Sequence, residues 1–106
     1  MTHLIFDFMI RVEDIVEAIG KDLNTTLVLH KSIETHPRFK VYKIYSYGLY
    51  AIEDDKIMLL SFKVNKNSST DNMAEAWDDC DKQFISYIVS WLSSDIYKKL
   101  KNDRSK

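Results

Sequence analysis

The spacing of apolar residues changes twice along this chain, and this change constrains its fold more than any other feature. In the first twenty residues, apolar side chains recur every three or four positions, as on one face of a helix. Between residues 25 and 64 they tend to alternate with polar ones, which is typical of strands. After residue 71 the helical spacing returns. The sequence therefore predicts an α+β fold with helices before and after a sheet.

The first expected element is a helix over about residues 3–20. Its apolar face is formed by Ile5, Phe8, Met9, Val12, Ile15, Val16 and Ile19. Gly20 is predicted to end this helix, because glycine readily adopts the left-handed conformation of a helix C-cap.

A four-stranded antiparallel meander is expected in the middle of the chain. Its strands are predicted over residues 25–33 and 38–47 and in two shorter runs within 49–64, joined by a turn over 53–56. Gly48 is predicted to mark a turn or bulge between the second and third strands. Helices packed on one face of this sheet are the simplest arrangement for such an order of elements.

The C-terminal part predicts one long helix over about residues 71–100, or two helices separated by a break at 93–95. The basic segment 98–106 is expected to be a frayed tail. A chain of 106 residues suits a single domain, 1–106.

Composition limits the protein class. Apolar residues make up 45% and charged residues 29% of the chain, as in soluble globular proteins. Cys80 is the single cysteine, so no intramolecular disulfide can form. The N-terminus lacks the basic start of a signal peptide, and no apolar run approaches the ~18 residues of a membrane span. We therefore expect a cytoplasmic protein that does not enter the membrane.

Acidic residues gather at the start of the last predicted helix. Residues 71–81 contain no Lys or Arg and five carboxylates, namely Asp71, Glu75, Asp78, Asp79 and Asp81. Favourable interaction with the helix dipole explains the first two, but the other three lie beyond the first turn and repel one another. They form either a solvated face or a docking surface for a cationic protein, and the docking hypothesis requires that they remain free of partners within the chain.

The second half of that helix is apolar over more than half of its circumference, through Phe84, Ile85, Tyr87, Ile88, Val89, Trp91 and Leu92. The sheet and the N-terminal helix together would bury such a stripe. Otherwise the part of this apolar surface that stays exposed is an interface, as in a homodimer.

Basic and aromatic residues meet in the predicted sheet. Lys31, Arg38, Lys40 and Lys43, together with Tyr42, are the candidates for contact with nucleic acid, in which cations hold phosphates and rings stack on bases. A net charge of −1 argues against a general nucleic-acid binder, so this is the weaker alternative.

No catalytic, cofactor or metal site is predicted. His3, His30, His36 and Cys80 are the only imidazole and thiol groups, and their spacing does not match a zinc site. The leading hypothesis is a non-enzymatic inhibitor, a monomer or homodimer, that binds a cationic protein such as a nuclease-type toxin. Bacterial immunity proteins are of this general kind in size and charge. The alternatives are a nucleic-acid-binding or regulatory protein and a dimeric secretion-type chaperone.

Overall fold

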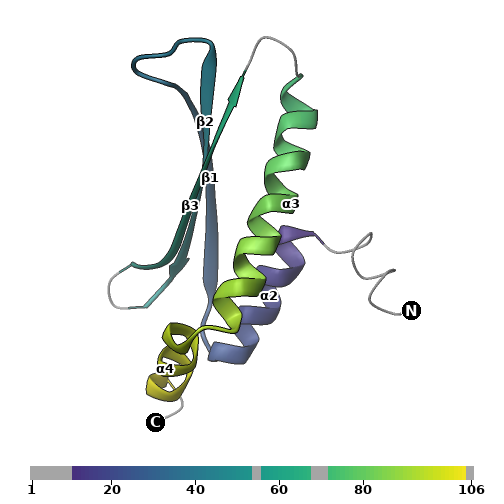
Figure 1. Ribbon diagram of the computed structural model, residues 1–106. Helices are drawn as coiled ribbons and strands as arrows, with labels where there is room; N and C mark the ends of the chain where they lie inside the picture. Colours follow the sequence, from purple (N-terminus) through teal and green to yellow (C-terminus); the bar gives the residue numbers. More distant parts are fainter. Residues whose placement is uncertain (1–10, 54–55, 68–71, 105–106) are drawn as a thin grey trace, which may run out of the picture.

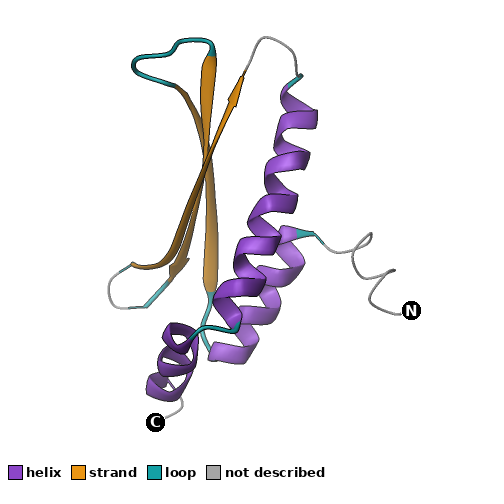
Figure 2. Cartoon of the chain, in the orientation of Figure 1, coloured by secondary structure: helices purple, strands orange, loops and turns teal. Residues whose placement is uncertain are grey.

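The protein is an α+β fold of two layers, a sheet and a layer of helices on one face of it (Figures 1 and 2). The computed structural model describes residues 11–53, 56–67 and 72–104. The elements are α2 (Val12–Leu23), β1 (Leu27–Thr35), β2 (Tyr42–Ala51), β3 (Ile57–Asn67), α3 (Met73–Leu92) and α4 (Asp95–Arg104).

Helix α2 continues beyond the residue that was predicted to end it. It passes through Gly20 to Leu23, and Asn24 forms the left-handed cap with φ 55°. Gly20 has a different role, because a Cβ atom at this position would lie 2.9 Å from the carbonyl oxygen of Thr25. The glycine thus lets the chain turn back closely against the helix into β1. Residues 1–10, with the predicted Ile5, Phe8 and Met9, lie outside the described residues.

The sheet has three strands in the order β1-β2-β3, all antiparallel, so the prediction of four strands is wrong. The predicted second and third strands are one strand, β2, and Gly48 lies inside it between His30 of β1 and Ser61 of β3. A Cβ atom at Gly48 would lie 2.8 Å from the ring of Tyr50. Gly48 therefore makes room for an aromatic ring on the sheet surface instead of turning the chain. Ala51 pairs with Ile57, so the strands on either side of the predicted turn over residues 53–56 are antiparallel neighbours, and residues 54 and 55 of that turn lie outside the described residues.

The core lies between the inner face of the sheet and the helices. Tyr47 and Phe84 are at its centre, where their rings stack at 4.3 Å, and both are at most 2% exposed. Helix α2 adds Val12, Ile19 and Leu23 to the same cluster. Each such side chain contributes about 1.5–3 kcal/mol when fully buried. The broad apolar stripe of α3 is thus shared between the sheet and α2, although Val89 remains 56% exposed.

The two C-terminal helices are separate, as one of the two predictions allowed. The chain breaks at Ser93 and Ser94, and the Ser94 hydroxyl accepts a hydrogen bond from the Tyr97 N–H at 3.2 Å. Helix α4 then runs to Arg104, so the prediction of a frayed tail is wrong for residues 98–104. Residues 105 and 106 lie outside the described part of the chain.

Ion pairs hold α4 against the rest of the fold. The Tyr97 hydroxyl donates to Asp22 at 2.5 Å, and Lys101 lies 2.9 Å from the same carboxylate. Arg104 pairs with Glu53, which also accepts a hydrogen bond from Thr25 at 2.7 Å.

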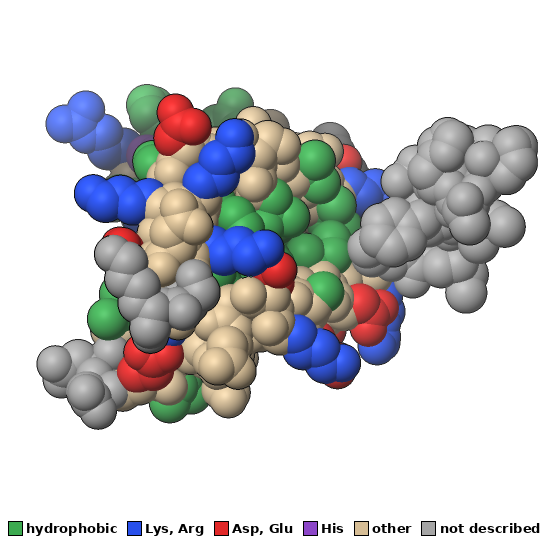
Figure 3. Space-filling model, turned by 90° about the horizontal axis from the view of Figure 1, so that it is seen from below, with side chains coloured by type: hydrophobic (Ala, Val, Ile, Leu, Met, Phe, Trp, Pro, Cys, Tyr) green, Lys and Arg blue, Asp and Glu red, His purple; other side chains and the backbone are tan. Residues whose placement is uncertain are grey.

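Seen from the end of the molecule where α4 lies, hydrophobic side chains gather in the middle of the surface, with charged ones of both signs around them (Figure 3).

Candidate binding surfaces

The acidic residues of α3 point in two directions. Asn72 caps the helix by accepting the Glu75 N–H at 2.8 Å, which places Glu75 in the first turn. Glu75, Asp78 and Asp79 are exposed, whereas Asp81 is half-buried and faces the sheet. Asp71, which was predicted to belong to the same group, lies outside the described residues. The structure therefore retains three of the five predicted carboxylates on the outer face.

Asp81 is part of a polar network beneath α3. Its carboxylate lies 3.1 Å from Lys31 Nζ and accepts a hydrogen bond from the Tyr47 hydroxyl at 2.5 Å. Lys31 Nζ also lies 4.7 Å from the centre of the Trp77 ring, a cation–π contact. Burial, followed by the bond to Asp81, raises the pKa of Tyr47. Asp81 and Lys31 thus neutralise each other inside the fold.

The outer carboxylates are also partly neutralised. Asp79 pairs with Lys66 of β3 and accepts a hydrogen bond from Gln83 at 3.0 Å, and the Lys66 contact lowers the pKa of Asp79. Asp78 lies 3.4 Å from Lys82, one helical turn away, where both side chains are more than 70% exposed. The requirement that these acids be free of internal partners is therefore not met for Asp78, Asp79 or Asp81. Of the described acids of this face, Glu75 has no ion-pair partner within the described ranges, and Asp78 has only a solvent-exposed one, which is a weak interaction that a partner can replace.

The predicted nucleic-acid contacts are divided between two places. Lys31 lies inside the fold beside Asp81, as described above. Arg38, Lys40, Tyr42 and Lys43 come together in and beside the β1–β2 connection, residues 36–41, which we call the hairpin tip. Arg38 and Lys40 are exposed, and neither has a carboxylate partner among the described residues. Lys43 instead donates to the Thr35 hydroxyl at 3.1 Å.

The hairpin tip has a defined conformation and an apolar surface. His36 Nδ1 accepts the N–H groups of Arg38 and Phe39, each at 3.1 Å, and the tip closes through His36 N–H to the Tyr42 carbonyl. Phe39 is 59% exposed and Val41 54%. Continued back from β2, strand alternation would place these two on the same side as Tyr45 and Tyr47, which are buried. They are exposed because the tip extends past the end of the helical layer (Figure 1).

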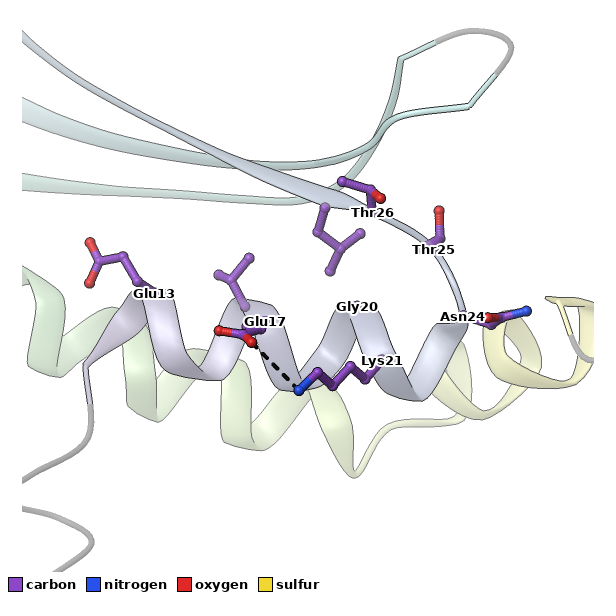
Figure 4. A pocket seen from close by; sticks show the side chains of 9 residues that line it. Glu13, Glu17, Gly20, Lys21, Asn24, Thr25 and Thr26 are labelled. Carbon is purple, nitrogen blue, oxygen red and sulfur yellow. Dashed lines mark ion pairs between the residues drawn. The ribbon is translucent and has the colours of Figure 1, made fainter.

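The opposite end of β1 borders a groove of about 570 Å³ between this strand and α2 (Figure 4). Val16, Gly20 and Leu27 form its apolar part. Glu13 and Glu17 stand on the helix side, with Glu17 3.5 Å from Lys21. Glu13 has no ion-pair partner in the described ranges. This groove could not be predicted from the sequence, in which Glu13 and Glu17 are simply polar positions outside the apolar face of a helix.

No described element packs on the face of the sheet that points away from the helices (Figure 2). A shallow hollow of about 300 Å³ lies over its middle, where Ser32, Ser46, Gly48 and Ser61 leave space beside Tyr50.

Within residues 11–53, 56–67 and 72–104, no three His, Cys, Asp or Glu side chains are close enough to hold a metal ion. Cys80 is fully buried, and burial raises its pKa, so its thiol is held in the unreactive form.

Comparison with known proteins identifies no relative. No family model, curated protein or solved structure matches the chain. No described helix is long and apolar enough to cross a membrane. Function must therefore be argued from these surfaces alone.

Proposed function

We propose that this protein is a non-enzymatic inhibitor that binds a cationic protein, in the manner of immunity proteins that neutralise nuclease-type toxins. The observation that carries the proposal is the outer face of α3, where Glu75 and Asp78 are exposed on a helix whose other side is anchored in the core. Fixed carboxylates of this kind attract a positive partner and speed its association.

The contact is smaller than the sequence predicted. Asp81 serves the fold, and Asp79 shares its charge with Lys66. We therefore assign the partner contact to Glu75 and Asp78, with Asp79 as an auxiliary acceptor.

The test is to capture the partner from the native host with the tagged chain and to measure its affinity for variants. Glu75→Lys with Asp78→Lys should weaken binding at least tenfold, because attraction becomes repulsion. Asp95→Lys with Asp103→Lys, the same charge change on α4, should leave affinity nearly unchanged. Equal losses for both pairs, or no loss for the first, would exclude α3 as the contact.

Nucleic-acid binding is the second candidate, favoured by the grouping of Arg38 and Lys40 with Phe39 at the hairpin tip. It predicts binding of a single-stranded oligonucleotide that weakens steeply with added salt. Absence of a shifted band at low salt would rule it out.

A further inference from the structure

The imidazole of His36 fixes the conformation of the hairpin tip. Its Nδ1 atom accepts two backbone hydrogen bonds, from the Arg38 N–H and from the Phe39 N–H, each at 3.1 Å. Two backbone bonds close the tip, His36 N–H to the Tyr42 carbonyl and Tyr42 N–H to the Phe39 carbonyl, both at 2.9 Å. The His36 ring is half-buried, and the Phe39 ring lies 5.3 Å from it. One side chain therefore satisfies two backbone amides in a segment that extends past the helical layer (Figure 1).

The sequence favours this arrangement. Pro37 follows His36, and its fixed φ suits the second position of a turn. A side-chain acceptor placed just before such a turn, most often Asn or Asp, binds the backbone N–H two residues on. His36 uses a ring nitrogen for the same purpose. Unlike the amide of Asn, an imidazole loses this acceptor when it takes up a second proton.

The protonation state of His36 thus decides whether the tip can close. Nδ1 accepts only while it carries a lone pair, so the single proton of the neutral ring lies on Nε2. A second proton would be placed on Nδ1, where it would point at the N–H groups of Arg38 and Phe39. Contacts between donor and acceptor would then become contacts between donors, and both amides would lose their partner. The closed tip therefore requires neutral His36.

The charged groups around His36 lie on the tip and on the strands beside it. They are Glu34 on β1, Arg38 and Lys40 on the tip, Lys43 on β2, and Lys66, which faces Lys43 from β3 and is paired with Asp79. Four of these five groups around the ring are cations, so a proton taken up by His36 adds positive charge where positive charge already predominates. Repulsion then acts together with the lost hydrogen bonds to open the tip.

We propose that His36 is a proton-sensitive switch, which keeps the hairpin tip closed while the ring is neutral and opens it when the ring is protonated. Imidazoles take up their second proton within about pH 5–8, so the closed tip is stable above this range and opens as pH falls through it. Opening releases residues 37–41 and with them the surface that Arg38 and Phe39 form. The carboxylates of α3 take no part in the switch, so it does not depend on the proposed inhibitor function.

Nitrogen NMR of the full chain tests the starting state. At about pH 7.5, where imidazoles are mostly neutral, the ring shifts of His36 should show a proton on Nε2 and none on Nδ1. A proton on Nδ1 would exclude the switch, because that atom could not then accept the two amides.

Amide exchange tests the opening. The exchange rates of the Arg38 and Phe39 N–H groups with water are measured at about pH 7.5 and about pH 5.5, on either side of the usual imidazole titration. Each rate is compared with the rate expected of the unfolded chain at the same pH, which gives a protection factor. Protection of both amides should fall about fivefold at the lower pH, the factor that corresponds to a typical hydrogen bond. Equal protection at the two pH values would contradict the proposal.

Three variants separate His36 from the other groups. His36→Asn keeps an acceptor before Pro37 but takes up no proton, so both amides should be protected at both pH values. His36→Ala has no acceptor, so neither amide should be protected at either pH. His30→Asn removes an imidazole elsewhere on β1 and should behave as the wild type. Protected amides in His36→Ala, or protection that falls at the lower pH in His36→Asn, would overturn the proposal.

Discussion

Asp81 of α3 lies 3.1 Å from Lys31 of β1 and is joined through the same carboxylate to the Tyr47 hydroxyl of β2. This contact connects the helical layer to two strands at a half-buried position. It also converts a carboxylate that looked available for a partner into part of the fold.

Removal of Asp81 should therefore destabilise the protein. Asp81→Ala leaves the Lys31 ammonium and the Tyr47 hydroxyl without their acceptor, at a cost of about 1–3 kcal/mol in the free energy of unfolding. Asp78→Ala, an exposed acid three residues earlier on the same helix, should change it by less than about 0.5 kcal/mol. Urea unfolding followed by circular dichroism would measure both. Similar values for the two variants would contradict the role given to Asp81.

Two of the buried tyrosines, Tyr47 and Tyr97, predict a loss of stability at alkaline pH. Burial and carboxylate acceptors raise the pKa of Tyr47 and of Tyr97 above the usual value. The unfolded chain then loses these protons first, so stability is retained below about pH 10 and falls as pH rises above it. Tyr47→Phe should flatten this fall, whereas Tyr42→Phe, at the exposed start of β2, should not. An unchanged slope in Tyr47→Phe would refute the assignment.

Helix α4 should detach at acid pH before the rest of the fold. Tyr97 and Lys101 lower the pKa of Asp22, and Arg104 lowers that of Glu53. Carboxylates with lowered pKa values stabilise the folded state above about pH 4 and cease to do so as pH falls below it. Amide NMR shifts of residues 96–104 should move toward random-coil values before those of α2. Asp22→Asn with Glu53→Gln should produce the same change at neutral pH.

Gly20 and Gly48 should respond differently to substitution by alanine. The new Cβ at position 20 would meet the backbone oxygen of Thr25 at 2.9 Å, and backbone cannot easily move away. We expect a net loss of about 1–3 kcal/mol, despite the ~1 kcal/mol by which alanine favours a helix. At position 48 the obstacle is the outer end of the Tyr50 side chain, which can rotate, so the loss should be smaller. Thermal unfolding would rank the two variants, and the reverse order would contradict this account.

The sequence by itself determined the class of fold, because local periodicity reports which face of each element is buried. The helix containing Val12, Ile15 and Ile19, the antiparallel strands on either side of residues 53–56 and the possible break near Ser93 could all be predicted in this way. At Gly48 the predicted turn is wrong, because a ring two residues away needs the space, whereas the predicted bulge corresponds to the register shift that follows between Leu49 and Tyr50.

Only the tertiary structure decided which charges are available to a partner. Asp81 and Lys31 are 50 residues apart in the sequence, and Glu53 and Arg104 are 51 residues apart. The packing of helices on the sheet nevertheless brings each pair into contact. Pairing across such distances depends on the direction of each side chain after the layers have packed, which no local pattern encodes. For the same reason the groove between α2 and β1 became visible only in three dimensions.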